Sequence, residues 1–358
     1  MSSRILLYAR VNPADGGGVQ SLVQGLARHL RARGHEVTKA WAFPAPPGSE
    51  DLTLPLRPVV LRGRLPAPRS TIWAAGALGR LTRLLFRLRP DVVNVHYVTG
   101  EAVYFALLKP LFRYRLVLSV HGSDVLRTQA PDAPLLPYVL PAADALTAVS
   151  PLTVAALKEY PDVNPARIRE IPNGVDYGFW SAGSDVRPGN RAPVVVSVAR
   201  LDRVKGHDVL LHAFALVRAR VPAARLVIVG EGGQRSALET LARLLGIAPA
   251  VEFTGQLDAE GVRERLRTAR VFALSSRSEG LPIALLEAMA AGATCVATNV
   301  GGTCEVLTPG TGLLVPSEDP AALAEAIVRL LVEDHSAARL ILEARRRAAR
   351  FPVAVTFA

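Results

Sequence analysis

The chain has 358 residues, half of them hydrophobic and a fifth charged, with 28 Gly and 27 Pro. This length and apolar content are enough for about two domains with buried cores, and they exclude a disordered chain. No apolar run reaches the ~18 residues that would cross a bilayer, and the first residues lack the apolar length and cleavage site of a signal peptide. The two cysteines, Cys295 and Cys304, have neither a metal-binding nor a disulfide spacing, so we expect a reducing, cytoplasmic location.

The net charge of +11 is distributed unevenly, with +8 in residues 1–180 and +3 in residues 181–358. Between Asp51 and Asp91 there is no acidic residue, and no aromatic pattern that would stack nucleic-acid bases. Such a stretch favours binding of a phosphorylated acceptor or peripheral contact with the inner face of an anionic membrane. The alternative is a solvated helix face in an arginine-rich chain. The arginines concerned are Arg57, Arg62, Arg64, Arg69, Arg80, Arg83, Arg87 and Arg89.

Short β-branched runs alternate with longer stretches at helical spacing, which predicts βαβ units and parallel sheets buried on both faces. Two such sets predict two doubly wound domains, residues 1–180 and 181–358, joined in the polar stretch 181–193. The strands are expected at Ile5–Ala9, Glu36–Trp41, Asp91–His96, Leu116–Val120, Ala145–Val149, Val194–Ala199, Leu226–Val229, Val251–Phe253, Val271–Leu274 and Thr294–Ala297, and helices at Val19–Arg33, His207–Arg220, Gln234–Leu245, Ile283–Ala291 and Pro320–Leu331.

Unusual residues follow several of these strands, at the end where open parallel sheets bind ligands. Gly16, Gly17 and Gly18 open the first helix, and their amides favour an anion, or form a tight turn. His121, followed by Gly-Ser-Asp124, can hydrogen-bond a sugar or orient a leaving group, although a lone histidine is also common as a structural residue.

In the second half, Arg200 and Lys205 flank the loop after a strand, where two cations can clamp a diphosphate; the alternative is two exposed surface charges. Lysine is scarce, with four among the 42 basic residues, which favours a functional role for Lys205. Gly230 and Gly232 follow the next strand and can lie against a base or ribose. As a dinucleotide fingerprint this glycine pattern fails at Arg235.

Glu279 and Glu287 are the only charges in SEGLPIALLEAMAAG, residues 278–292. We expect a helix from Gly280 with Pro282 in its first turn, so that Glu279 lies at the electropositive end. Eight residues of helix span roughly 12 Å, more than the ~5–9.5 Å between the paired carboxylates of glycosidases. The two carboxylates are therefore expected to hold two ends of one elongated ligand.

Taken together, these segments resemble the retaining GT-B glycosyltransferases of family four, whose E-x7-E signature Glu279–Glu287 matches. The resemblance covers most of the chain, through GGVQSLVQGLARHLRARGHEVT, VHGSDV, TAVS, IPNGVD, ARLDRVKGHDVLL, VGEGGQRSALE and VGGTCEV. It implies a GT-B fold, two facing Rossmann-like parallel-sheet domains with a cleft, in which the C-terminal domain holds the nucleotide sugar. The acceptor would be a glycan, a lipid-linked molecule or a small molecule.

The resemblance also implies roles for single residues. Arg200 and Lys205 would neutralise the diphosphate, Glu287 would bind the ribose, and Glu279 would bind the transferred sugar. His121 would lie near the reacting carbon. Gly17, Gly18, Gly230, Gly232, Gly280 and Leu281 complete the expected donor-binding set, and Gln20, Asp124 and Asn173 are acceptor-side residues, with Asn173 near an interdomain hinge.

No Asp-x-Asp occurs in the chain, so no metal or other cofactor is expected, and cationic side chains and glycine amides would carry the diphosphate charge. Retention would then proceed by front-face attack. The sequence ends at ARRRAARFPVAVTFA, where family members usually continue through a further crossover helix, so that helix is expected to be short or missing.

Two other functions remain open. A nucleotide-sugar 2-epimerase on the same fold would act on the donor alone. A non-catalytic relative would bind a nucleotide sugar without turnover, although every charged residue of the motifs is present.

Overall fold

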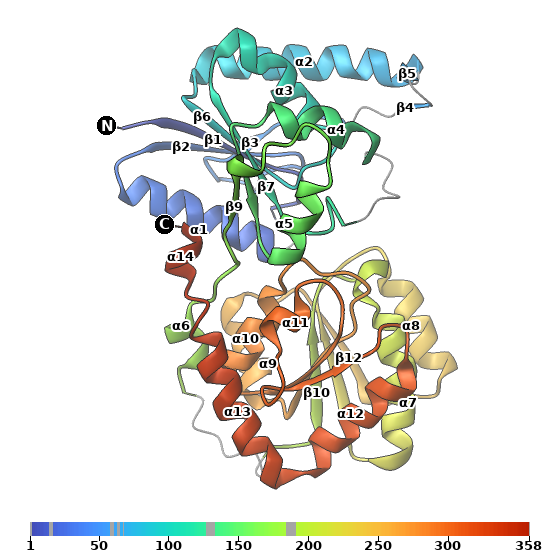
Figure 1. The fold of residues 1–358 in the computed structure, drawn as a ribbon. Coiled ribbons are helices and arrows are strands. Elements are labelled where there is room, and N and C mark those ends of the chain that lie inside the picture. Colours follow the sequence, from blue (N-terminus) through green and yellow to red (C-terminus); the bar gives the residue numbers. More distant parts are fainter. Residues whose placement is uncertain are drawn as a thin grey trace. The chain divides into compact units, whose positions relative to one another are not determined.

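A computed structural model describes residues 2–13, 17–57, 61–62, 65–66, 68–126, 133–183 and 191–357. The chain divides into two compact units, Met1–Ile171 with Phe357, and Pro172–Thr356. Each unit is built on one parallel sheet covered by helices (Figure 1). The predicted fold class, two doubly wound α/β domains, is confirmed. Gly16 and most of the expected joint, residues 184–190, lie outside the described residues.

The first unit contains a seven-stranded parallel sheet in the order β3-β2-β1-β6-β7-β8-β9. Strand β1 shows why both faces are apolar. Leu6 and Tyr8 enter the core beneath α2 and α3, whereas Ile5, Leu7 and Ala9 enter the core beneath α1. The elements are β1 Arg4–Ala9, α1 Gly18–Ala32, β2 Glu36–Trp41, β3 Leu52–Thr53, β4 Leu61–Arg62, β5 Leu65–Pro66, α2 Pro68–Leu88, β6 Val92–His96, α3 Ala102–Phe112, β7 Arg115–Val120, α4 Leu136–Val139, β8 Ala145–Ala148, α5 Pro151–Lys158 and β9 Ile168–Glu170.

The second unit contains a six-stranded parallel sheet in the order β12-β11-β10-β13-β14-β15. Its first strand, β10, lies in the interior, with β11 on one side and β13 on the other, so the chain reverses its direction of travel between β10 and β13. The elements are α6 Tyr177–Ser181, β10 Val194–Val198, α7 His207–Arg220, β11 Arg225–Val229, α8 Arg235–Leu244, β12 Val251–Gly255, α9 Ala259–Thr268, β13 Val271–Leu274, α10 Ile283–Ala291, β14 Thr294–Thr298, α11 Thr303–Val306, β15 Leu313–Val315, α12 Pro320–Val332, α13 Asp334–Ala348 and α14 Val353–Phe357.

Helix α10 corrects the expected helix start, because it begins at Ile283 and not at Gly280. Pro282 occupies the N-cap position in an extended conformation. A proline also disfavours helical geometry in the residue before it, which keeps Leu281 out of the helix. Consequently Glu279 lies in a loop, and the helical estimate of the Glu279–Glu287 separation applies only from Ile283 onward.

The two ends of the second unit's chain lie beside each other. The Val175 N–H donates to the Phe351 carbonyl at 2.8 Å, and the Val353 N–H donates to the Val175 carbonyl at 3.2 Å. The segment after α13 is thus tied to the segment that opens the unit. Among the described residues, no helix has the length and apolarity needed to span a membrane.

Candidate functional site

The loops that follow β10, β11 and β13 meet at the carboxyl edge of the second sheet. Because β10 and β13 are neighbours and the chain turns in opposite directions from them, the loops diverge and leave room beside the strand ends. The predicted residues Arg200, Lys205, Gly230, Gly232 and Glu279 all lie in these loops.

The β10 loop contains a short 3₁₀ turn, Arg203–Lys205, followed by Gly206 with φ of +63°. Glycine is required at this position because a Cβ would lie 2.1 Å from the Ser275 carbonyl oxygen. Ser275 also donates from Oγ to the Lys205 carbonyl at 3.0 Å. The β10 and β13 loops are therefore in direct backbone contact, which fixes the position of Lys205.

Lys205 and Glu279 form an ion pair, with Nζ and Oε1 2.7 Å apart. The Ser276 hydroxyl donates to the same oxygen at 2.6 Å. The Glu279 residue is only 7% exposed. The sequence assigned the two charges to different parts of a ligand, whereas in this structure they bind each other.

Arg200 is the more accessible cation of the site. Its guanidinium pairs with Asp202 at 3.1 Å, and both side chains are more than one-third exposed. A pair this exposed contributes little stability and is easily exchanged for another anion. Arg200 is therefore available to a ligand in a way that Lys205 is not until Glu279 or Ser276 rearranges.

Gly230 and Gly232 allow the β11 loop to lie against the β10 loop. A Cβ on Gly230, whose φ is +139°, would lie 2.0 Å from the Ala199 carbonyl oxygen, and one on Gly232 would lie 2.6 Å from that of Leu201. The Leu201 N–H donates to the Glu231 carbonyl at 2.8 Å. Close packing of two backbones already accounts for both glycines, so the expected contact with a base or ribose stays a prediction.

The Glu279 loop is held from two other sides. A Cβ on Gly301 would lie 1.7 Å from the Glu279 carbonyl oxygen, and Gly302 donates its N–H to that oxygen at 3.3 Å. Asn173 donates from Nδ2 to the Leu281 carbonyl at 2.9 Å, while its buried Oδ1 has no partner within the described part of the chain. Asn173, expected on the acceptor side, thus lies against the predicted donor loop that also contains the buried residue Gly280.

Glu287 lies on α10, partly buried among apolar neighbours. Burial raises the pKa of its carboxyl group to about 7, because the charged form loses hydration that nothing nearby replaces. A group that titrates near neutral pH on an otherwise apolar helix is unusual in a structural role.

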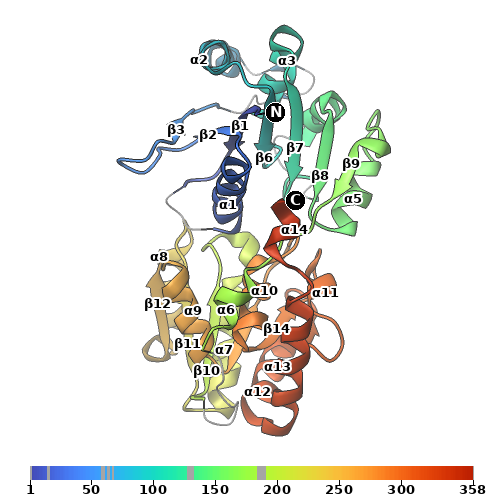
Figure 2. The same cartoon turned by 90° about the vertical axis from the view of Figure 1, so that its left-hand side faces the viewer.

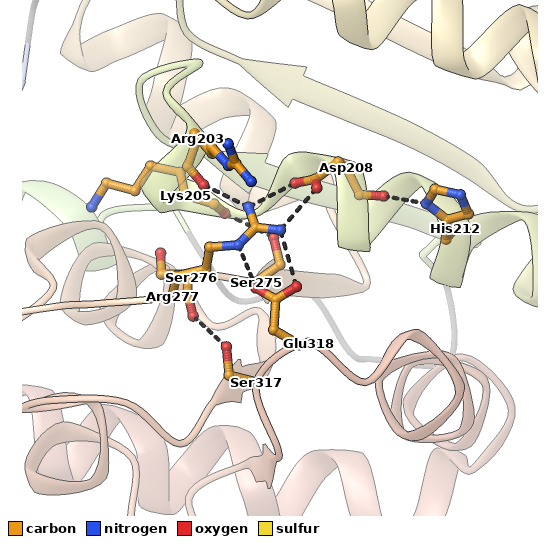
Figure 3. A network of polar contacts seen from close by, with 9 residues as sticks. All are labelled: Arg203, Lys205, Asp208, His212, Ser275, Ser276, Arg277, Ser317 and Glu318. Atoms are coloured by element: carbon orange, nitrogen blue, oxygen red, sulfur yellow. Dashed lines mark hydrogen bonds and ion pairs between the residues drawn. The ribbon is translucent and has the colours of Figure 1, made fainter.

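Figure 3 shows a polar network that the sequence analysis missed. The Arg277 guanidinium donates to both Asp208 oxygens, at 2.9 and 2.8 Å, to Glu318, and to the Arg203 carbonyl at 2.6 Å. These hydrogen bonds, above all those to Asp208, raise the pKa of Arg277 and lower that of Asp208. Arg277 thereby ties the turn that carries Lys205 to α7 and to the loop after β15. Its place just after β13 is the signal that could have identified it.

In the first unit, His121 is buried directly after β7 and forms a pair with His96, the last residue of β6. The His96 Nδ1 and His121 Nε2 atoms are 3.3 Å apart. Burial lowers the pKa of His121 to about 4, so the ring is neutral near physiological pH. Asp124 accepts from the His121 and Val98 N–H groups at 3.1 Å, and burial raises its pKa to about 6. His96 is a further residue that the sequence did not identify.

The helix opening in the first unit contains Gly17 as the N-cap of α1 and Gly18 as its first residue. Gln20 is buried and donates from Nε2 to the Asn12 carbonyl at 2.9 Å. A Cβ on Gly17 would lie 2.6 Å from the Gln20 Oε1 atom. This amide therefore packs on the turn that precedes it, and these contacts alone explain the position of Gln20 without a ligand.

Within the described part of the chain, no cluster of three or more His, Cys, Asp or Glu side chains is placed to hold a metal ion. The cationic groups Arg200 and Lys205 are the side chains of this site that can neutralise an anion. The expectation of metal independence stays a prediction.

Comparison with known proteins gives two consecutive family matches. Residues 16–179 match the family described as Glycosyltransferase Family 4, and residues 184–347 match Glycosyl transferases group 1. A GDP-mannose-dependent alpha-(1-6)-phosphatidylinositol monomannoside mannosyltransferase from Mycolicibacterium smegmatis is 32% identical, over 94% of this chain and 91% of its own. A D-inositol 3-phosphate glycosyltransferase from Acidothermus cellulolyticus is 31% identical, over 88% and 78%.

Solved structures share the GT-B fold. Sucrose-phosphate synthase from Thermosynechococcus elongatus has a TM-score of 0.81 at 24% identity, covering 99% of this chain and 96% of its own. HepE from Anabaena, in complex with UDP and glucose, has a TM-score of 0.79 at 19% identity, covering 99% and 97%.

The Arg277 network generates a prediction about local rigidity. Replacing Arg277 by Gln removes charge-assisted hydrogen bonds, each worth about 1.5–3 kcal/mol, so amide exchange in residues 203–206 should accelerate by about 10–100-fold. Hydrogen-exchange mass spectrometry measures this. Arg220→Gln, which breaks an exposed ion pair with Glu325 at the far end of α7, is the control and should leave these amides unchanged. Equal exchange in Arg277→Gln and the unmodified chain would show that the network does not hold the turn.

Proposed function

The chain belongs to glycosyltransferase family four, and from this membership we propose that it is a retaining, metal-independent enzyme. It moves a hexose or an N-acetylhexosamine from a UDP- or GDP-sugar to an acceptor hydroxyl. The observation that carries the proposal is the pairing of Lys205 with Glu279 beside Arg200, at the carboxyl edge of the second sheet. Two cations and a carboxylate at this edge match a diphosphate joined to a sugar.

The proposed reaction is a front-face substitution. The bond between the anomeric carbon and the diphosphate oxygen breaks, and the acceptor oxygen bonds to that carbon from the same side. The acceptor's proton passes to the departing diphosphate oxygen, so no protein base is consumed. Arg200 and Lys205 stabilise the charge that develops on the leaving group, in a site already organised for it.

Glu279 has two tasks in this scheme. In the free protein it satisfies the Lys205 ammonium group at 2.7 Å. With donor bound, the diphosphate takes over part of that role, and the carboxylate accepts hydrogen bonds from sugar hydroxyls. The ion pair thus keeps the buried Glu279 carboxylate and the half-buried Lys205 ammonium group compensated until substrate arrives, which avoids the cost of an unpaired buried charge.

GDP-mannose is the first donor to test, because relatives at 31–32% identity are named as GDP-mannose-dependent mannosyltransferases. The names of the acceptors of several relatives contain an inositol group, either phosphatidylinositol monomannoside or D-inositol 3-phosphate. We therefore propose an acceptor that carries an inositol phosphate. For the first unit we retain the implied roles, with Gly17 and Gly18 toward phosphate, His121 near the reacting carbon, and Gln20 and Asp124 toward the acceptor.

Helix α2 supports peripheral contact with an anionic membrane. Phe86 is 63% exposed, and Arg83 and Arg87 beside it are also exposed; Trp73, nearer the start of the helix, is 50% exposed and lies against Arg57. Apolar rings beside unopposed arginines are the combination that binds to the surface of an anionic bilayer.

The leaving-group clamp gives the main test. In an assay with GDP-mannose and phosphatidylinositol mannoside in the presence of EDTA, the unmodified chain should form the mannosylated lipid. Arg200→Ala or Lys205→Ala should lower kcat by about 10²–10³-fold, the usual effect of losing one charge-stabilising group. Arg203→Ala, an exposed neighbour on the same turn, should change kcat less than about threefold.

Three outcomes of that assay would reject parts of the proposal. Strict dependence on magnesium or manganese would reject the metal-free mechanism. Epimerised sugar formed from donor alone would favour a 2-epimerase. Donor binding without turnover across a panel of donors and acceptors would favour a non-catalytic relative.

Glu287 generates a pH prediction. Ribose hydroxyls donate to its carboxylate, so the nucleotide binds the charged form, and GDP affinity should rise up to tenfold per pH unit below about 7 and level off above it. Glu287→Ala should weaken GDP binding roughly 10–100-fold above pH 7 and remove the pH dependence. Calorimetric titration at several pH values measures both. An affinity for GDP that is the same in Glu287→Ala would contradict the ribose role.

Membrane contact is tested by flotation with vesicles that contain phosphatidylinositol. The Arg83→Glu and Arg87→Glu double variant should reduce the vesicle-bound fraction more than tenfold, since each arginine near an anionic surface contributes about 1 kcal/mol. Arg225→Gln, an exposed arginine in the second unit, is the control. Undiminished flotation of the double variant would exclude α2 as the contact surface.

A further inference from the structure

A hollow of about 880 Å³ lies in the second unit, away from the donor loops. Its walls come from the loop 308–312 before β15, from α12 and from α13, and none of the residues assigned to the donor site lines it. Helices α12 and α13 follow each other directly and pack together (Figure 2). The hollow is thus a separate feature of the second sheet's outer layer.

Five arginines and one acid line the hollow. On α13 the charged residues fall at spacings of three, four, seven and eight, which places them on one face of the helix. Phosphate groups are the anions that such a cluster suits, because a guanidinium donates to phosphate oxygens in bidentate fashion. The lining charges are Arg329 from α12, Arg339, Glu343, Arg346 and Arg347 from α13, and Arg350 just after it.

The arginines are only partly compensated by protein groups. Arg346 pairs with Glu343 at 2.8 Å and Arg329 with Glu333 at 3.2 Å, and all four side chains are at least 40% exposed. Exposed pairs of this kind contribute little and exchange readily with another anion. Arg339 and Arg350 are exposed and have no ion pair with any described residue.

Arg347 supplies a second observation, which concerns a buried atom of its side chain. It donates to the Glu305 carbonyl on α11 and its guanidinium lies 5.1 Å from the Phe351 ring centre. Its Nε atom is buried and has no hydrogen-bond partner among the residues that the structure describes. A buried donor without a partner destabilises the folded chain, so a shift of the Arg347 side chain that lets an acceptor oxygen in the hollow reach Nε is favoured.

We infer that this hollow is a second anion-binding site, for a small soluble ligand that carries at least two phosphate groups. The concave form and the volume suit a small molecule, since ligand pockets occupy about 300–1,000 Å³. A flat membrane surface fits less well, because none of the large exposed apolar side chains, such as Leu342 and Val332, lines the hollow. The inference does not depend on the proposed function.

Ligand at this site would also bear on the donor loop. Arg347 contacts α11, and α11 follows directly on Gly301 and Gly302, whose backbone touches that of Glu279. A phosphate that draws Arg347 into the hollow would therefore alter a helix that begins one residue after a donor-loop contact.

The test uses inorganic triphosphate with the full chain in EDTA, followed by hydrogen-exchange mass spectrometry. Triphosphate should slow amide exchange in residues 308–313 and 339–350. If triphosphate also enters the donor site, slower exchange in residues 200–206 will show this separately. The Arg339→Gln and Arg350→Gln double variant should lose the first protection and bind at this site more than tenfold more weakly. Arg225→Gln, an exposed arginine on β11 outside the hollow, should behave as the unmodified chain does.

Several results would overturn the inference. Protection confined to residues 200–206 would mean that triphosphate binds only at the donor site. An equal loss of protection in Arg225→Gln would mean that triphosphate responds to net charge alone. If the double variant binds triphosphate as the unmodified chain does but floats less with anionic vesicles, the arginines belong to a membrane-binding surface. If the double variant is less stable, the footprint on the unmodified chain still decides, because absence of protection at 308–313 and 339–350 rejects the site.

Discussion

The ion pair between Lys205 and Glu279 is the interaction on which the candidate site depends. An ammonium group and a carboxylate 2.7 Å apart, with the carboxylate nearly buried, must be held by their surroundings or the desolvation cost would separate them. The surroundings do hold them. Gly206 brings the β10 loop onto Ser275, Ser276 donates to the carboxylate, and Arg277 fastens the turn to α7. Backbone contact between two strand-end loops therefore fixes where charge is placed.

Much of this arrangement follows from sequence. Short β-branched apolar runs identified ten strands of the two sheets to within one or two residues, because strands buried on both faces need apolar side chains throughout. The rule that parallel strands end at one edge then brought Arg200, Lys205 and Glu279 together. The short strands β3, of two residues, and β9 and β15, of three residues each, were missed because a run of that length has no readable period.

The sequence could not predict which charged side chains of the site bind one another. Lys205 and Glu279 are separated by 74 residues, and their pairing depends on the β10–β13 register and on a glycine contact. The helix start also failed, at Gly280, because the extended conformation of Pro282 outweighed the helical propensity of the residues around it. Arg277, which follows β13, and His96, which ends β6, were overlooked because a single charge or ring at a strand end has many structural uses.

The contact between Gly301 and the Glu279 carbonyl oxygen has a consequence for sequence variation in relatives. Any side chain at position 301 would need the space that this oxygen occupies, 1.7 Å from where its first carbon would stand. The Glu279 loop would have to shift, and with it the carboxylate that holds Lys205. A substitution at Gly301, whose own side chain carries no functional group, would therefore displace the Lys205–Glu279 pair, and an alanine at this position in a relative would indicate that the backbone of its Glu279 loop differs.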